Sequence, residues 1–309
     1  MLPRGGGRGN RSAKLAIFPG RNPSMIYVLA SAICSVLVSV LLKLARRYGL
    51  DIGQAVAWNY VAAGVLAALL LPAPLAPLRQ PGAPWFALAG LGVLLPVIFL
   101  ALGASVRHAG IVRSDAAQRL SLLLSLLAAF LLFGEKLDAI KVLGCVLGLA
   151  ALLGMVWRIG ASHGEAGAER WAWPFAVFAG FGAIDVLFKR VAAAHVPLGT
   201  SLVAMFALAL VVAFALAAWR AVRGGARFRL RNTLGGLLLG LFNFGNILFY
   251  LRAHRALPQH PALVFASMNL GVVVLGALTG VLLFRERLSR INLAGLLLAL
   301  LAIALLAWA

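Results

Sequence analysis

Ten long apolar runs make up most of this sequence and constrain its fold more than any other feature. They cover Met25–Leu44, Gly53–Leu71, Trp85–Val106, Ile111–Phe133, Ala139–Trp157, Trp171–Val191, Gly199–Trp219, Leu234–Leu251, Ala262–Phe284 and Ile291–Trp308. A helix rises about 1.5 Å per residue, so about 20 apolar residues cross a hydrocarbon layer about 30 Å thick. Barrel strands would instead alternate in polarity over about ten residues, and these runs do not. The sequence therefore predicts an all-α integral membrane protein with ten transmembrane helices.

The charged residues favour a membrane surface over a nucleic acid as the partner. They make up 12% of the chain, against about 25% in soluble domains, and the net charge is +20. Lys and Arg are scattered over the first 24 residues and nearly every loop, so no separate domain presents a basic face. Basic residues beside membrane spans contact anionic head groups. We predict the lipid bilayer as a partner and no nucleic acid.

The sequence contains none of the residue patterns that would indicate an enzyme. Cys34 and Cys145 lie inside apolar runs, which gives neither a disulfide framework nor a Cys-x-x-Cys pair. The histidines lack metal-ligand spacing, and there is no phosphate-binding glycine loop. No nucleophile, acidic pair or His/Glu group marks a membrane enzyme. We predict a non-enzymatic protein without cofactor or metal, which leaves a transporter or a structural or assembly protein of the membrane.

A short charged motif occurs twice between apolar runs. It reads Phe133-Gly134-Glu135-Lys136-Leu137 and, 151 positions later, Phe284-Arg285-Glu286-Arg287-Leu288. The register continues, since Gly144 matches Gly295. This predicts a duplicated unit, with a basic tail over residues 1–24 and five-helix repeats over 25–157 and 171–309. Because five is odd, the second repeat is inverted relative to the first. Met25 is an alternative start of translation.

The two motif copies also carry a resemblance to a known family. Leu120-Ser121-Leu122 through Leu137, and Asn269-Leu270-Gly271 through Leu288, resemble the EamA-type repeat. The chain is thus similar to ten-helix members of the drug/metabolite transporter superfamily. That resemblance implies inverted repeats around a central cavity, alternating access and, usually, export of small metabolites or drugs. It also implies a multi-pass protein of the bacterial inner membrane with both termini in the cytoplasm, although Lys and Arg are divided too evenly to orient the chain.

Two acidic residues lie inside predicted spans, Asp115 and Asp185. Each has a cation four residues later on the same helical face, Arg119 and Lys189. One interpretation is a pair of structural salt bridges. The other is that these charges line a cavity for substrate or protons, since ionisable groups within a membrane are costly and usually functional.

Polar side chains follow helical spacing in three spans: Ser31, Ser35, Ser39 and Lys43 in the first, Ser114, Gln118, Ser121 and Ser125 in the fourth, and Asn243, Asn246 and Tyr250 in the eighth. Candidate substrate-binding or coupling residues are Gln118, Asn243, Asn246, Tyr250 and Lys43 from these stripes, together with Asn269 of the ninth span. Gln118 and Asn269 are 151 positions apart and so occupy matching sites in the two repeats. We expect Gln118, Arg119, Asn243, Asn246 and Asn269 to face one cavity between the repeats. Close helix packing is the alternative for the serines in these stripes, and snorkelling for Lys43.

The second span departs from the family pattern, in which many relatives have an Arg early in this helix. This chain has Trp58-Asn59-Tyr60 there, which makes Trp58 and Asn59 candidates and means that the resemblance does not identify the solute.

Asp185 is the predicted site of proton coupling. It lies fourteen residues from Trp171 at the start of its span, whereas Asp115 lies four residues into its own. A free Asp ionises near pH 3.9, and a cation one turn away keeps it ionised. Proton coupling would therefore require the Asp185–Lys189 pair to open in one conformational state.

Small residues predict close helix contacts. The pairs Gly144/Gly148, Gly236/Gly240 and Gly276/Gly280 suit tight packing within one protomer or, alternatively, in a homodimer. Pro96 is expected to bend or interrupt the third span.

Overall fold

The computed structural model describes residues 23–308 except 110, 137, 157–168, 225–228 and 285–289. All regular structure in these residues is helical. The elements are α1 (Pro23–Arg47), α2 (Ile52–Leu70), the 3-10 helix η1 (Ala76–Arg79), α3 (Trp85–Ala109), α4 (Ile111–Leu120), α5 (Leu122–Leu131), α6 (Ala139–Val156), α7 (Glu169–Ala193), α8 (Leu198–Gly224), α9 (Leu230–Ala256), α10 (Pro261–Phe284) and α11 (Arg290–Trp308). The predicted all-α fold is confirmed.

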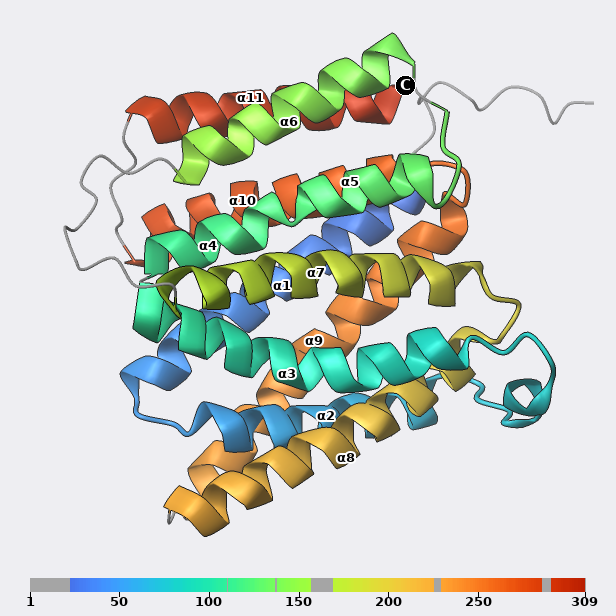
Figure 1. Cartoon of the computed structure of the whole chain (residues 1–309), viewed down its shortest axis with the longest axis vertical. Helices are drawn as coiled ribbons and strands as arrows, with labels where there is room; N and C mark the ends of the chain where they lie inside the picture. The colour runs from blue at the N-terminus through green and yellow to red at the C-terminus, as the bar shows by residue number, and fades with distance from the viewer. Residues whose placement is uncertain are drawn as a thin grey trace, which may run out of the picture.

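The helices match the ten apolar runs closely, because α4 and α5 together occupy one of them. Ser121 between them keeps helical backbone angles, and the chain continues in the same direction (Figure 1). Six helices, α1, α2, α3, α8, α9 and α10, are long and apolar enough to cross a membrane. Shorter apolar stretches lie in α4–α5, α6 and α11. Helix α7 is less apolar, since Asp185, Lys189 and Arg190 lie near its end.

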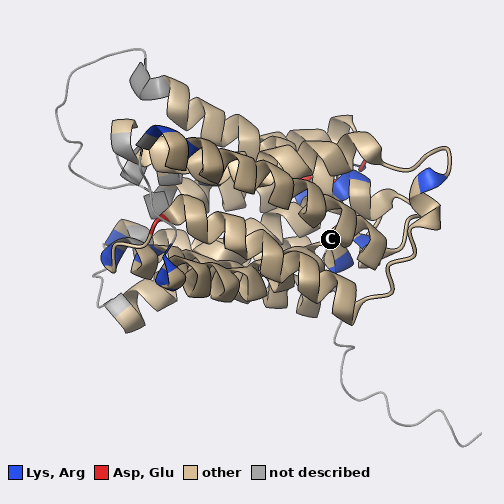
Figure 2. Ribbon diagram, turned by 90° about the horizontal axis from the view of Figure 1, so that it is seen from below, with Lys and Arg blue, Asp and Glu red and all other residues tan. Residues whose placement is uncertain are grey.

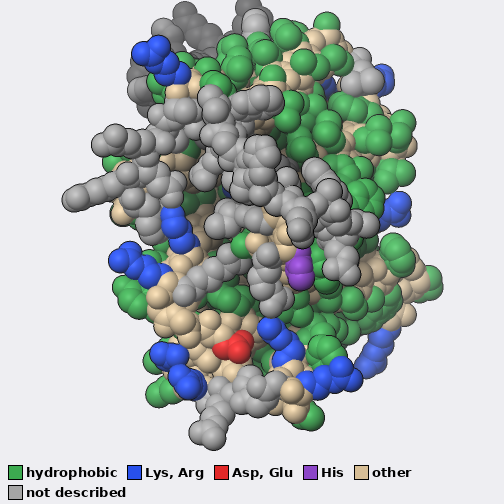
Figure 3. All heavy atoms as spheres, turned by 60° about the vertical axis from the view of Figure 1, so that its left-hand side comes forward, with side chains coloured by type: hydrophobic (Ala, Val, Ile, Leu, Met, Phe, Trp, Pro, Cys, Tyr) green, Lys and Arg blue, Asp and Glu red, His purple; other side chains and the backbone are tan. Residues whose placement is uncertain are grey.

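Most of the long helices run roughly along one direction of the bundle, and α9 crosses them obliquely (Figure 1). Helix α1 begins at the same end of the bundle as α11 finishes, and we call this the termini end. The α5–α6 turn and the α9–α10 loop lie there too. Lys and Arg residues gather towards both ends, whereas the middle is almost free of them (Figure 2). The face seen from the opposite end carries basic side chains among many hydrophobic ones (Figure 3).

The outer surface of the bundle is strongly apolar. Large side chains such as Phe86, Val222 and Leu282 are 82%, 87% and 77% exposed. Hydrophobic exposure on this scale is unfavourable in water and suits contact with lipid chains. The fold and its surface are those of a multi-pass membrane protein.

Glycines allow two of the closest helix contacts within the protomer. A Cβ on Gly236 or Gly240 of α9 would meet the backbone of α2 at Ala55 or Asn59. A Cβ on Gly144 of α6 would meet Leu306 of α11. Two of the three glycine pairs thus pack inside one chain. By contrast, Gly276 has nothing within 4 Å of its Cβ position.

Pro96 does not interrupt its helix, because α3 continues from Trp85 to Ala109. An interruption at Pro96 is therefore wrong, whereas a bend there stays a prediction.

Candidate functional site

A half-buried carboxylate, Asp185 of α7, lies where three helices of the bundle meet. Its Oδ2 accepts a hydrogen bond of 2.6 Å from Ser125 Oγ of α5, and its Oδ1 accepts one of 2.8 Å from Tyr250 OH of α9. Both donors are buried. We call these three residues the Asp185 cluster. Hydroxyl donors from two other helices satisfy the carboxylate, so its geometry depends on how α5, α7 and α9 are placed relative to one another.

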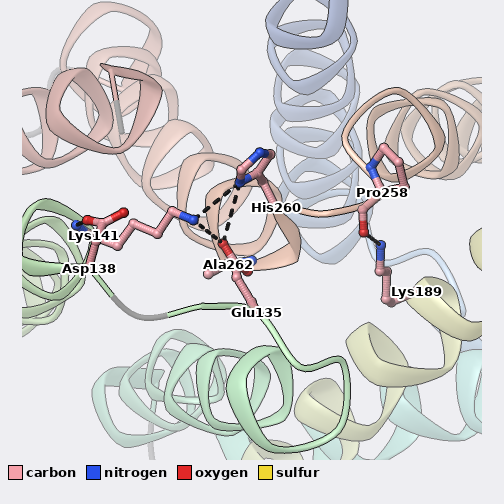
Figure 4. A network of polar contacts seen from close by, with 7 residues as sticks. All are labelled: Glu135, Asp138, Lys141, Lys189, Pro258, His260 and Ala262. Carbon is pink, nitrogen blue, oxygen red and sulfur yellow. Dashed lines mark hydrogen bonds and ion pairs between the residues drawn. The ribbon is translucent and has the colours of Figure 1, made fainter.

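Lys189 does not pair with Asp185, although the two lie one turn apart. Its Nζ donates a 2.7 Å hydrogen bond to the carbonyl of Pro258 in the α9–α10 loop (Figure 4). It also lies 5.9 Å from the centre of the Phe133 ring. The predicted Asp185–Lys189 salt bridge is therefore wrong, because each group has nearer partners on other elements. The side chain of Asp115 lies outside the described residues, and so does any pairing of it with Arg119.

His254 adds a second ionisable group beside the cluster. It lies one turn after Tyr250 on α9, with ring centres 4.8 Å apart, and 4.9 Å from the Phe265 ring of α10. The residue is 1% exposed, and neither ring nitrogen has a hydrogen-bond partner among the described residues. Buried polar groups are usually satisfied, so an imidazole without a partner among these residues is an exception in this bundle. His254 was not among the residues predicted from the sequence, because it lies beyond the predicted end of the span at Leu251, although it continues the stripe of Asn246 and Tyr250.

The predicted amides take different partners. Ser31 of α1 lies 2.8 Å from the Asn246 carbonyl and 2.9 Å from its Oδ1. Asn269 Nδ2 donates to the Phe265 carbonyl of its own helix. Asn243 is buried, and its Nδ2 has no partner in the described part of the chain. Gln118 is half-buried. That these amides face one common cavity stays a prediction.

A cavity of about 130 Å³ lies between α1, α4 and α10. Its lining residues are Val36, Ser39, Val40, Lys43, Arg119, Val272, Gly276, Thr279 and Gly280. Two cations from different helices, Lys43 and Arg119, thus border the same space. Lys43 is four residues from the end of α1, so the cavity lies towards the opposite end of the bundle. At about 30 Å³ per molecule, the space holds a few waters or one polar group of a solute.

The two candidates of the second span, Trp58 and Asn59, contact α8 and α9 and do not line the cavity between α1, α4 and α10. The Trp58 ring contacts Phe214 of α8 edge-on at 5.6 Å, and Asn59 is buried where α2 meets Gly240 of α9. Neither amide atom of Asn59 has a partner among the residues that the structure describes.

The first copy of the charged motif connects the two halves of the chain at the termini end. Glu135 is buried in the α5–α6 turn and forms an ion pair with Lys141 Nζ at 3.3 Å (Figure 4). His260 Nδ1 lies 3.3 Å from the same Nζ and 3.9 Å from the carboxylate. The other carboxylate oxygen accepts a 2.7 Å hydrogen bond from the N–H of Ala262. Glu135 therefore stabilises the first turn of α10, where backbone N–H groups lack helical partners. In the second motif copy, all residues after Phe284 lie outside the described residues.

No cluster of three or more potential metal ligands occurs among the described residues. The fold and the buried polar groups are those of a polytopic membrane protein with polar side chains deep in its helix bundle.

Comparison with known proteins identifies the family to which this chain belongs. The model of the EamA-like transporter family matches residues 22–157. A Haemophilus influenzae (strain ATCC 51907 / DSM 11121 / KW20 / Rd) protein described as uncharacterized is 39% identical over 283 residues, which cover 89% of this chain and 95% of that protein. One solved crystal structure superposes with a TM-score of 0.68 at 20% identity, covering 93% of this chain and 96% of the other, and so shares the fold. The chain belongs to the EamA-like transporter family, as its repeat motifs predicted.

Proposed function

We propose that this protein is a secondary transporter that moves a small solute across the bacterial inner membrane by alternating access, in the direction of export. The observation that carries the proposal is the Asp185 cluster, a half-buried carboxylate within a helix of the bundle that accepts hydrogen bonds from hydroxyls of two other helices. A structural membrane protein has little use for such a group, because a carboxylate within a membrane span is costly and apolar packing would stabilise the bundle better.

The pattern of helix packing supports two inverted repeats over 25–157 and 171–309. A shift of 151 positions relates α1 to α7, α2 to α8 and α3 to α9. Helix α1 packs on α9, and correspondingly α7 packs on α3. Likewise α2 packs on α9 and α8 on α3, while the last helices of the two halves, α6 and α11, pack on each other. Exchanged partners of this kind suit a two-fold relationship, and solutes bind at the interface between such repeats.

The polar groups along the bundle support a state that is closed at the termini end. The α5–α6 turn is connected there to α10 through the contacts of Glu135 with Lys141 and His260. Lys189 of α7 donates a hydrogen bond to the α9–α10 loop. Towards the opposite end lies the cavity with Lys43 and Arg119. Alternating access would require the termini-end contacts to separate while this cavity closes.

Asp185 is the proposed coupling residue, with protons as the coupling ion. Ser125 and Tyr250 hydrogen-bond to it, and Lys189 on the same helix and His254 on α9 are the nearby groups that can carry a positive charge. Movement of α5 or α9 away from α7 would remove the hydroxyl donors and leave the carboxylate desolvated, which favours protonation. Gln118, Arg119, Asn243, Asn246 and Asn269 are the proposed solute contacts, and both termini are proposed to be cytoplasmic.

Reconstitution of the purified protein tests this function. Proteoliposomes loaded with candidate solutes should show solute movement that depends on the protein and on an imposed pH gradient. A melting-temperature screen across metabolite classes identifies which solutes to test, since a ligand bound only to the folded state raises its stability. Absence of both solute-induced stabilisation and transport over a broad panel would favour the alternative, a structural or assembly protein of the membrane.

A further inference from the structure

A large apolar groove lies on the side of the bundle between α3, α5 and α7. Its volume is about 720 Å³, and its lining residues are Phe86, Gly90, Leu94, Leu124, Leu127, Ala128, Leu131, Leu132, Ala179, Gly182, Ala183, Val186, Leu187 and Arg190. Several of these side chains are largely exposed, among them Phe86, Leu127 and Leu131, so the groove opens laterally on the apolar flank of the protein. Every side chain of the lining is apolar except that of Arg190.

The groove extends from the termini end to the middle of the bundle. On α7 its lining runs from Arg190, three residues before the end of the helix, back to Ala179. Eleven residues at about 1.5 Å each give a length of about 16 Å, close to half of a hydrocarbon layer about 30 Å thick. Phe86 is the second residue of α3, and Leu132 follows the last residue of α5, so both also lie at the termini end. The groove therefore has the depth of one leaflet.

Arg190 lies at the end of the groove where lipid head groups are found. Its side chain is exposed, and among the described residues it forms no ion pair and no hydrogen bond. A guanidinium presents a planar set of donors that suits phosphate oxygens. An occupant with a long apolar chain and an anionic phosphate head would match both the walls of the groove and its charged end.

We propose that this groove binds one acyl chain of an anionic phospholipid from the leaflet at the termini end, with the lipid phosphate at Arg190. A polar solute does not suit walls of this composition. The groove floor includes Gly182 and Ala183, which precede Asp185 on α7. The bound lipid therefore contacts α3, α5 and α7 together, and α5 and α7 both contribute to the Asp185 cluster. The lipid site stands whether or not the protein transports a solute.

Lipid binding by the full-length protein in detergent tests the proposal. Native mass spectrometry and melting temperatures would be measured with added phosphatidylglycerol or phosphatidylcholine. Arg190→Gln removes the charge at the head-group position. Ala183→Trp fills the groove from an exposed position, and Leu131→Trp does so from α5 should the first variant fold poorly. Arg79→Gln, an exposed cation of η1 at the same end but outside the groove, is the matched control.

Wild type and Arg79→Gln should retain phosphatidylglycerol and bind it more tightly than phosphatidylcholine. Arg190→Gln should weaken phosphatidylglycerol binding about fivefold, the effect of one basic residue at an anionic membrane surface, and lose the preference between the two lipids. The tryptophan variants should lose binding of both. Equal phosphatidylglycerol binding by wild type and Arg190→Gln would overturn the head-group assignment. Unchanged lipid binding in folded Ala183→Trp and Leu131→Trp would overturn the groove itself.

Discussion

Tyr250 of α9 donates its hydroxyl to the Asp185 carboxylate of α7 across 2.8 Å, which joins two helices that both come from the second half of the chain. Ser125 adds a donor from the first half. The two bonds differ in what they constrain. Tyr250 fixes α9 on α7 within one half, whereas Ser125 fixes the halves against each other, and so the Ser125 bond is the one expected to change when the halves move.

Tyr250→Phe should destabilise the folded protein by about 1.5–3 kcal/mol, because it removes a hydrogen bond to a charged acceptor without creating a cavity. Tyr60→Phe is the matched control. Tyr60 is equally buried, but its hydroxyl has no hydrogen-bond partner among the described residues, so its removal should leave stability unchanged or raise it. Melting temperatures in the same detergent measure both changes. Equal melting temperatures of Tyr250→Phe and wild type would mean that the Tyr250–Asp185 bond contributes nothing to stability.

Glu135→Ala should destabilise the protein by about 3–5 kcal/mol, because Lys141 would then be a buried cation without its partner. The double variant Glu135→Ala/Lys141→Ala should lose less than the sum of the single changes, since the two residues interact directly. Lys136→Ala, at the exposed neighbouring position, should shift stability by less than about 0.5 kcal/mol. Additive single effects in this cycle would show that the ion pair does not contribute to the junction with α10.

The span positions could be predicted from the sequence because bilayer thickness dictates the length of an apolar run. The predicted start at Ala262 is one residue from the observed start of α10 at Pro261. The partners of the charged groups could not be predicted in this way. Helical spacing places Asp185 and Lys189 on one face, but it gives no information on the Pro258 carbonyl, which another loop brings to Lys189.

The same limit applies to two further residues. His254 was missed because α9 continues five residues beyond the predicted end at Leu251, as polar residues at a helix end lower the apolar signal without ending the helix. Glu135 was placed correctly in a turn between spans. Its bond to Ala262 depends on a neighbour 127 positions away, and that neighbour follows only from the assembled bundle.

Labelling of single cysteines should place both ends of the chain on the same side of the membrane. Cysteines introduced at Pro23 and after Trp308, in a background that lacks Cys34 and Cys145, should react only with a membrane-permeant maleimide in intact cells, because we expect both termini in the cytoplasm. A cysteine at Ile52, at the opposite end, should react with an impermeant reagent as well. Labelling of the two termini from different sides would contradict the even number of crossings, and labelling of both from outside would reverse the proposed orientation.

Asp185→Asn should abolish solute transport driven by a pH gradient while leaving solute binding and solute exchange largely intact. The amide keeps the size of the side chain and an acceptor for one hydroxyl, but it cannot bind and release a proton. Lys189→Gln should retain a response to the pH gradient, because Lys189 bonds to the Pro258 carbonyl and not to Asp185. Asp51→Asn is the matched carboxylate control, since Asp51 caps α2 at the opposite end and Asn caps helices equally well.

Transport in proteoliposomes, with and without the gradient, and exchange of labelled solute at equal pH measure the two activities separately. If Asp185→Asn still concentrates the solute against its gradient when driven by the pH difference, Asp185 is not the coupling residue. If the variant loses binding and exchange as well, the carboxylate acts in solute binding or in folding rather than in proton coupling.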